Sequence, residues 1–318
     1  MPRVSISEYE QLSGKKKTQI QKVGDGLIIT RFDRTPIPSR GTDVVCPHFV
    51  QLKWATGCPY NCAWCYLQGT FRFQDYKKSP HIKDMKKMEA AVRSLLDNDQ
   101  NKAPEILNAG ELSDSLLSER TDDPFSKRIM KLLEGQDRYK VLFVTKSIDV
   151  DNLLTVTNPE NCIVSFSVNA PDVSKLWEHA APDPISRLDA AKKLVDVGFT
   201  VRLRLDPMVP IEGWKEGYDS FVDSIFERFT PNRITMGSLR GLQSTINNSK
   251  DKTWTPYLTE RSNWGRKVDY EIRLEMYRSL IDKLNEKGFK EFALCKETVD
   301  CWNALGLDYK KISCNCTL

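Results

Sequence analysis

Short apolar runs alternate with longer amphipathic stretches from Val44 to about Arg240. The short runs are rich in β-branched and aromatic residues, which favours strands; they cover Phe49 to Trp54, Glu105 to Asn108, Val141 to Thr145, Ile163 to Ser167, Val201 to Leu205 and Arg233 to Met236. The amphipathic stretches have the helical period and cover Ile82 to Leu96, Asp123 to Glu134, Pro184 to Val197 and Tyr218 to Phe229. Because a crossover helix returns the chain for parallel pairing, the pattern predicts an α/β fold, a partial (β/α)6 barrel of the TIM type.

The pattern divides the chain into three segments. We expect an N-terminal extension over residues 1–43, the partial barrel over 44–241, and a helical, Cys-rich C-terminal segment over 242–318. Within the last segment, the polar stretch Gln243 to Gly265 predicts a long loop or insertion, and Tyr270 to Lys287 predicts a charged amphipathic helix.

Composition narrows the class of protein. The chain has 318 residues, of which 40% are hydrophobic and 28% charged, so it can bury a substantial core. It lacks an apolar run of about 20 residues, which excludes a membrane span, and Met1 to Lys22 lacks the apolar segment of a signal peptide. We therefore expect a cytoplasmic protein. The net charge of +4 is too mild to indicate nucleic-acid binding.

Nine cysteines stand out in a chain expected to reside in a reducing compartment, where metal binding or redox chemistry is commoner than structural disulfides. They fall into a loop trio, Cys58, Cys62 and Cys65; a C-terminal group, Cys295, Cys301, Cys314 and Cys316; and two isolated residues, Cys46 and Cys162.

The loop trio has C-x3-C-x2-C spacing, in the run Cys58-Pro-Tyr-Asn-Cys62-Ala-Trp-Cys65-Tyr66. Three thiolates can hold three irons of a cubane [4Fe-4S] cluster and leave the fourth iron open for a small molecule. A structural zinc site normally has a fourth Cys or His ligand, and the nearest histidines are His48 and His81. The spacing favours an open cluster over a zinc knuckle or three unligated core cysteines.

Polar residues follow one predicted strand after another, and strand ends of this kind converge at one mouth of a barrel. They include Glu111, Ser113, Asp114, Lys146, Ser167, Asn169, Asp206 and Arg240. A lysine with two hydroxyls can bind a carboxylate there; the alternatives are a solvated lysine and serines that only cap helices or turns. Arg240 either clamps an anion or belongs to a structural ion pair.

The cysteine loop resembles the signature of the radical S-adenosylmethionine (SAM) superfamily, and further blocks are similar to the spore photoproduct lyase family. These blocks are Leu112-Ser113-Asp114, Phe143-Val144-Thr145-Lys146, Phe166-Ser167-Val168-Asn169-Ala170 and Glu212-Gly213-Trp214-Lys215-Glu216-Gly217-Tyr218. The resemblance implies a [4Fe-4S] cluster on Cys58, Cys62 and Cys65, and SAM as cofactor. It also implies reductive cleavage of SAM to a 5'-deoxyadenosyl radical, with ferredoxin or flavodoxin as electron donor.

Carried over by residue, the resemblance places Ser113, Lys146 and Ser167 on the carboxylate and amino groups of SAM. Asn169 joins this cofactor-binding set, and Tyr66 would lie beside the adenosyl part.

The sequence departs from the family at three points. Glu111 stands where the lesion-repairing lyases carry a hydrogen-donating cysteine, Trp64 replaces a tyrosine, and the DNA-facing hairpin has no visible counterpart. Glu111 is therefore a catalytic candidate, as a base or as a ligand of the substrate or of SAM; the alternative is an ion pair with a neighbouring Lys or Arg.

The C-terminal cysteines allow three interpretations. Cys295, Cys301, Cys314 and Cys316 would bind an auxiliary iron-sulfur cluster, or Cys316 or Cys314 would be a free hydrogen donor, or all four would be buried small hydrophobic residues.

The sequence thus predicts a radical SAM enzyme that abstracts hydrogen from an unidentified organic substrate, in epimerisation, oxidation or lyase-type chemistry. The alternatives are a DNA-repair lyase for thymine lesions and a non-catalytic metal-binding module.

Overall fold

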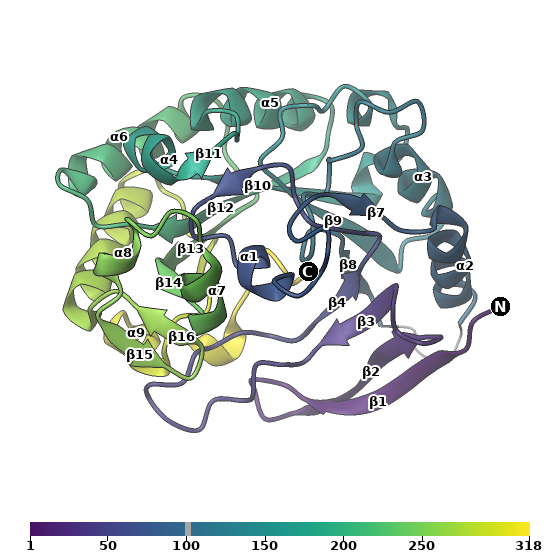
Figure 1. The fold of residues 1–318 in the computed structure, drawn as a ribbon, viewed down its shortest axis with the longest axis horizontal. Coiled ribbons are helices and arrows are strands. Elements are labelled where there is room, and N and C mark those ends of the chain that lie inside the picture. Colours follow the sequence, from purple (N-terminus) through teal and green to yellow (C-terminus); the bar gives the residue numbers. More distant parts are fainter. Residues whose placement is uncertain (99–102) are drawn as a thin grey trace.

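The computed structural model describes residues 1–98 and 103–318. Its main feature in that part of the chain is a ten-stranded sheet with the order β1-β2-β3-β4-β8-β9-β10-β12-β13-β17 (Figure 1). The strands from β4 onward are parallel; they are β4 (Phe49–Leu52), β8 (Glu105–Asn108), β9 (Tyr139–Thr145), β10 (Cys162–Val168), β12 (Thr200–Met208), β13 (Arg233–Ser238) and β17 (Phe292–Leu294). The first six confirm the six predicted strands, whereas β17 was not predicted.

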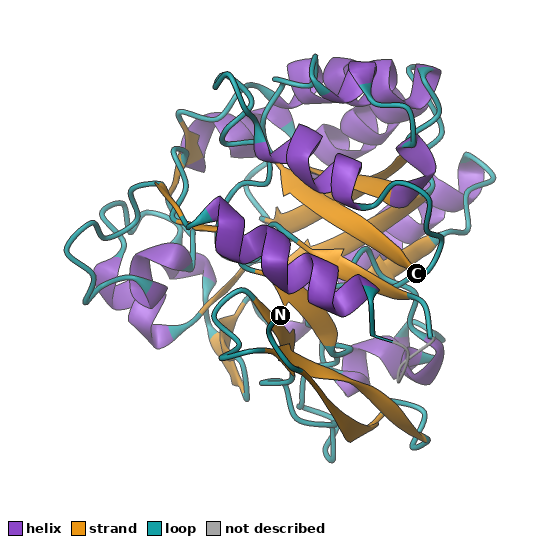
Figure 2. Ribbon diagram, turned by 90° about the vertical axis from the view of Figure 1, so that its right-hand side faces the viewer, coloured by secondary structure: helices purple, strands orange, loops and turns teal. Residues whose placement is uncertain are grey.

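Helices lie outside the strands in both views (Figures 1 and 2). They are α2 (Met85–Leu96), α3 (Phe125–Leu132), α4 (Pro171–Trp177), α5 (Pro184–Asp196), α6 (Trp214–Phe226) and α8 (Tyr270–Glu286). Three of these helices have an aspartate as the N-cap residue: Asp84 for α2, Asp183 for α5 and Asp269 for α8. Each side chain accepts hydrogen bonds from backbone N–H groups of the first turn. The predicted helices are confirmed, and α4 is an additional short one. No helix among the described residues combines the length and apolar character needed to cross a bilayer.

The N-terminal residues extend the sheet. β1 (Val4–Glu10), β2 (Lys16–Val23) and β3 (Ile29–Phe32) pair in antiparallel fashion, and β3 pairs with β4. Strands from both flanking segments therefore hydrogen-bond into the sheet of the central one. The division at residues 43/44 and 241/242 stays a prediction.

The stretch predicted as a long loop is partly ordered into regular elements, so that prediction was wrong in part. It contains α7 (Gln243–Asn248) and the hairpin of β15 (Glu260–Ser262) and β16 (Gly265–Lys267), which pairs with β14 (Arg240–Gly241). Gly265 at the turn has φ +92°, a conformation that glycine adopts without strain. Because residues 243–265 are mostly polar, elements this short have no periodicity that the sequence pattern could reveal. The remaining short elements are α1 (Leu67–Thr70), α9 (Val299–Ala304), β5 (Ala55–Thr56), β6 (Asn61–Cys62), β7 (His81–Ile82) and β11 (Glu178–His179).

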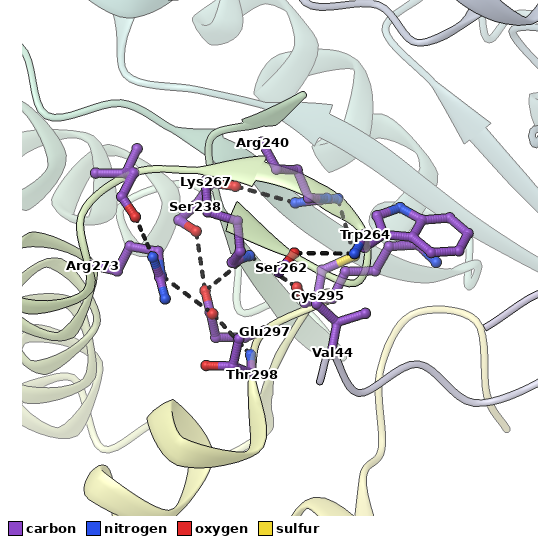
Figure 3. A network of polar contacts seen from close by, with 12 residues as sticks. Val44, Ser238, Arg240, Ser262, Trp264, Lys267, Arg273, Cys295, Glu297 and Thr298 are labelled. Carbon is purple, nitrogen blue, oxygen red and sulfur yellow. Dashed lines mark hydrogen bonds and ion pairs between the residues drawn. The ribbon is translucent and has the colours of Figure 1, made fainter. Parts of the chain in front are cut away.

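A buried carboxylate joins the C-terminal segment to the sheet (Figure 3). Glu297, just beyond β17, accepts hydrogen bonds from Ser238 Oγ at 3.0 Å and Tyr277 OH at 2.9 Å. Lys267 and Arg273 form ion pairs with it at 3.4 and 3.3 Å. Burial favours the neutral acid, but the two cations outweigh burial and lower the pKa of Glu297. The paired charge fixes β17 against β13, β16 and α8.

The C-terminal tail, residues 314–318, lies in the middle of the arc of strands (Figure 1). The side chain of Asn315 donates to Ser165 Oγ at 2.7 Å and to the Leu203 carbonyl at 2.9 Å, and it accepts from Thr235 Oγ1 at 2.8 Å. These partners belong to β10, β12 and β13. Arg202 and Arg233 donate to tail carbonyls, those of residues 314, 315 and 317. The tail is thus bound by side chains on the face of the sheet that lies inside the arc of strands. This face is called the inner face below.

Replacing Asn315 by alanine should loosen this tail. Asn315 is fully buried, and the change removes the side-chain hydrogen bonds of residue 315 to Ser165, Leu203 and Thr235. We expect the free energy of unfolding to fall by about 1–3 kcal/mol, measured by urea denaturation. Asn303→Ala, at an exposed position of α9, should stay within about 0.5 kcal/mol of wild type; equal losses in both variants would contradict the role given to Asn315.

Candidate functional site

The cysteine loop begins where β4 ends and is fixed by backbone contacts. Gly57 has φ +80°, and a Cβ there would lie 2.1 Å from the Ser79 carbonyl oxygen, so only glycine fits. The N–H of Cys58 donates to the Lys78 carbonyl at 2.8 Å, and β6, which contains Cys62, pairs with β11. The loop is therefore held against the edge of the sheet where the parallel strands end.

The three loop thiols are near neighbours. The charge of Cys65 acts on both Cys58 and Cys62. Burial raises the pKa of the Cys62 thiol to about 12, and the nearby Lys146 ammonium opposes that rise. Within residues 1–98 and 103–318, no three His, Cys, Asp or Glu side chains converge as ligands of one ion would. The trio remains the predicted cluster ligand set, in which each thiolate serves a different iron.

Ser113 lies beside this loop with an unused hydrogen-bonding group. It forms a parallel backbone bridge with Gly57, and its buried hydroxyl has no hydrogen-bond partner. The neighbouring Asp114 fixes its position, because that carboxylate accepts from Thr145 Oγ1 at 2.7 Å and from the N–H of Lys146 at 2.8 Å. An unsatisfied buried hydroxyl costs free energy unless a ligand supplies a partner, so Ser113 fits the predicted carboxylate-binding role.

Lys146 projects from the end of β9 into a buried charge cluster. Its Nζ lies 2.7 Å from Glu178 Oε1, and Arg187 Nη1 lies 2.6 Å from Glu178 Oε2. Burial would raise the pKa of Glu178, but Lys146 and Arg187 lower it overall. The alternative of a solvated lysine is wrong, because the Lys146 side chain is only 14% exposed. Glu178 and Arg187 were missed, since neither ends a predicted strand.

Ser167 and Asn169 end β10 next to this cluster. The Ser167 carbonyl accepts from Arg187 Nη1 at 2.9 Å. The Asn169 amide donates to the Pro207 carbonyl at 2.7 Å and accepts from Tyr218 OH at 3.0 Å. Asn169 therefore joins the ends of β10 and β12 to α6. Its predicted contact with SAM stays a prediction, as does that of Ser167.

Tyr66 and Glu111 meet across the same edge of the sheet. The Tyr66 hydroxyl donates to the backbone carbonyl of Glu111, so the cysteine loop contacts the loop after β8. Burial and the nearby charge of Cys316 raise the pKa of the Glu111 carboxyl to about 7, against the opposing effects of Lys296 and Arg204. The Asn108 amide at the end of β8 donates to the Cys316 sulfur at 3.8 Å, so the C-terminal tail lies near the loop that carries Glu111.

The C-terminal cysteines do not all share one environment. Cys316 accepts from Arg204 Nη2 at 3.2 Å, and its hydrogen bond with Cys314, followed by the effect of Arg204, lowers the pKa of Cys316. Cys295 accepts from Arg240 Nη2 at 3.5 Å. Cys301 is instead buried in α9 beside Glu297. Arg204 could not be identified from the sequence, because the pattern does not tell whether an arginine within a strand is buried or exposed.

Arg240 lies in a structural ion pair, as one of the two alternatives held. Its two terminal nitrogens each lie 2.8 Å from an oxygen of Asp206, at the end of β12.

The order of these blocks, from the cysteine loop through the ends of β8, β9 and β10, matches a family model. The model, described as spore photoproduct lyase, covers residues 48–239. The chain belongs to the spore photoproduct lyase family. The matched residues include the cysteine loop and the ends of β4, β8, β9, β10, β12 and β13.

Sequence relatives carry the family name. The chain is 26% identical over 177 residues to the spore photoproduct lyase of Clostridium acetobutylicum, covering 54% of this chain and 50% of that one. It is 30% identical over 169 residues to the Bacillus subtilis spore photoproduct lyase, covering 52% and 48%. The chain therefore spans about half the length of the curated relatives it matches.

Solved structures support the fold. A spore photoproduct lyase complexed with dinucleoside spore photoproduct has a TM-score of 0.64 at 20% identity, covering 77% of this chain and 75% of that chain. A variant of the same enzyme with bound AdoMet and dinucleoside spore photoproduct has the same TM-score, covering 78% and 75%.

The raised pKa of Glu111 predicts a pH-dependent stability. The folded chain holds the proton up to about pH 7, whereas the unfolded chain releases it near the ordinary value of 4.5. The free energy of unfolding of the metal-free chain, relative to Glu111→Gln, should therefore fall between about pH 5 and pH 8, by up to about 3 kcal/mol. Urea denaturation at both pH values measures it.

Glu134→Gln is the matched control, because Glu134 is exposed. Its stability should follow that of wild type at both pH values. A Glu111→Gln variant that also follows wild type would show that Glu111 has an ordinary pKa.

Proposed function

We propose that this chain is a radical SAM enzyme of the spore photoproduct lyase family. Cys58, Cys62 and Cys65 would hold the [4Fe-4S] cluster, and Ser113, Lys146 and Ser167 would bind the carboxylate and amino groups of SAM. The observation that carries the proposal is the unpartnered, buried Ser113 hydroxyl next to the cysteine loop. When bound together, the cluster and SAM supply a 5'-deoxyadenosyl radical by reductive cleavage.

The architecture that we propose for this chemistry is the incomplete (β/α)6 barrel, extended by β17. Parallel pairing from β4 to β13 supports it, since the strand ends that carry Ser113, Lys146, Ser167 and Asn169 share one edge of the sheet. The tail residues bind the inner face at positions earlier in the strands, such as Ser165 of β10. The substrate space would lie between the strand ends and the tail.

Charged residues around this space would bind and orient the substrate. Glu111, with a pKa near 7, would accept a hydrogen bond from a substrate hydroxyl or amine, or take its proton. Lys146 is oriented by Glu178 and would offer its remaining N–H groups to the SAM carboxylate. Tyr66 would stay beside the adenosyl part, because its hydroxyl is fixed to the Glu111 carbonyl.

The test is anaerobic reconstitution with iron and sulfide, reduction with dithionite, and assay for 5'-deoxyadenosine. Wild type should form it, and Cys62→Ala should not. Ser113→Ala should raise the SAM concentration for half-maximal formation about tenfold, as expected for a lost hydrogen bond to a charged group.

Ser94→Ala is the control for Ser113→Ala, since the Ser94 hydroxyl is also buried but bonds the Ala90 carbonyl within α2. It should leave the SAM dependence unchanged. An intact reduced cluster that leaves SAM uncleaved would contradict the proposal and favour a non-catalytic metal-binding module. Zinc in place of iron would do the same.

Within this class, the comparisons favour repair of a thymine lesion over an unidentified substrate. The relatives that match are spore photoproduct lyases, and two matching structures contain dinucleoside spore photoproduct. A lyase of this type must return the abstracted hydrogen atom, and a carboxylate such as Glu111 cannot donate one. The sources that we propose are a free thiol, Cys316 or Cys314, and 5'-deoxyadenosine itself.

Dinucleoside spore photoproduct tests the repair function directly. The reconstituted enzyme should convert it to unlinked thymine residues. Chromatography and mass spectrometry measure this conversion. Conversion is expected without a requirement for duplex DNA, because the net charge of +4 gives little affinity for a polyanion. Cleavage of SAM without conversion of the lesion would exclude the repair function and retain the radical SAM class.

Ferredoxin or flavodoxin is the proposed electron donor, and the cytoplasm the proposed location. A donor of low potential that replaces dithionite in the deoxyadenosine assay would support this partner.

A further inference from the structure

Four cysteines from three distant parts of the chain gather near the inner face of the sheet. Burial raises the pKa of the Cys295 thiol to about 12, and the charges of Asp206 and Cys46 add to the rise. A hydrogen bond with Cys316 and the charge of Cys46 both raise the pKa of the Cys314 thiol. Cys46 and Cys316 both line one cavity of about 350 Å³. Backbone contacts hold the segment that ends at Cys46 beside the segment that begins at Cys295, because Val44 bridges Thr298 and the N–H of Val45 donates to the Glu297 carbonyl at 2.8 Å.

The remaining two cysteines outside the loop trio have different surroundings. Cys162 and Cys301 are completely buried. Burial in apolar surroundings raises the pKa of Cys162, and Cys301 packs beside the carboxylate of Glu297. Both fit the role of small core residues.

The space around the four cysteines has an excess of positive charge. Among the ion pairs of the described residues, none joins Arg202, Arg204 or Arg233 to a carboxylate. Arg202 and Arg233 donate to tail carbonyls, and Arg204 donates to the Cys316 sulfur, with its Nε buried and unpartnered. Buried cations of this kind require a compensating anion.

We propose that Cys46, Cys295, Cys314 and Cys316 bind a second [4Fe-4S] cluster. Four thiolates outweigh the positive charge of the iron-sulfide core, so the cluster is an anion that suits three arginines without an ion-pair partner among the described carboxylate side chains. This set contains Cys46 in place of Cys301, which was the fourth member expected from the sequence. The sequence analysis did not group Cys46 with the other three cysteines, because Cys46 lies some 250 residues from them.

A cubane suits these four sulfurs better than a zinc ion does. Zinc needs every sulfur about 2.3 Å from one point, and no three such ligands in the described part of the chain converge on a point. A cubane spaces its ligands over four irons. The guanidinium of Arg240 next to the Cys295 sulfur (Figure 3) and that of Arg204 next to Cys316 would donate N–H···S bonds to the bound cluster.

This assignment has a consequence for the lyase chemistry. A thiolate bound to iron has no S–H bond, so Cys316 and Cys314 would not return a hydrogen atom to the product. The methyl group of 5'-deoxyadenosine would then return it: a C–H bond of that group breaks as the product C–H bond forms, and the deoxyadenosyl radical is regenerated.

The experiment starts from the full chain with Cys58, Cys62 and Cys65 all replaced by alanine, which removes the proposed radical SAM cluster. After anaerobic reconstitution, this triple variant should retain about four irons and four sulfides per chain, against about eight in wild type. It should also show the electron paramagnetic resonance signal of a reduced cubane.

Further single replacements in this background identify the ligands. Cys46→Ala should reduce the iron content to below about one per chain, whereas the matched control Cys301→Ala should retain about four. Circular dichroism of each metal-free variant checks that the fold persists. If it does not, Cys46→Ser serves as the replacement, because serine preserves the size of the side chain.

Other results would overturn the proposal. A triple variant without iron, alongside a wild type with about four, refutes the second cluster and leaves the radical SAM cluster intact. A triple variant that retains all the wild-type iron refutes the loop cluster, and with it the proposed function, but not the second site. Loss of iron in Cys301→Ala together with retention in Cys46→Ala refutes the ligand assignment, as does stoichiometric zinc.

Discussion

Parallel pairing is the constraint on which the rest of the structure depends. In the ten-stranded sheet, the strands β4, β8, β9, β10, β12, β13 and β17 run in one direction, so their carboxyl ends lie along one edge of the sheet. Residues separated by long helices thereby become neighbours: the cysteine loop follows β4, Ser113 follows β8 and Lys146 follows β9. The backbone bridge between Gly57 and Ser113 shows how closely the first two segments approach.

Buried charges have two kinds of partner in this structure. Glu178 and Glu297 are each buried between two cations, and both carboxyls have a lowered pKa despite burial. Such pairs add little net stability over apolar packing, but losing one partner is costly, so they specify position. The inner face has the opposite arrangement, because arginines there donate to carbonyls and to sulfur. This imbalance favours an anionic group in that space.

Much of the fold could be predicted from the sequence. The six strands and four helices of the central segment have strong periodicity and adequate length, and the cysteine loop has a specific spacing. β17 could not be predicted, because three residues carry no detectable period and it pairs with a strand some 60 positions earlier. The N-terminal strands were missed since their burial pattern is irregular, with several exposed or partly exposed positions on β1 and β2.

The candidate site shows the same limits. Ser113 and Lys146 were identified because each follows a recognisable strand within a family block. Glu178, Arg187 and Arg204 were not, since their roles depend on partners that only the tertiary structure brings near. The proximity of Cys46 to Cys295 and Cys314 likewise depends on long-range packing, and no spacing rule covers it.

The position of the tail has a consequence for biosynthesis. Asn315 bonds to residues 80 to 150 positions earlier, so the ribosome has already released β10, β12 and β13 when these last contacts become available. For an interval during translation the tail does not yet cover the inner face. Arg202 and Arg233 on that face then lack the tail carbonyls to which they donate in the finished fold.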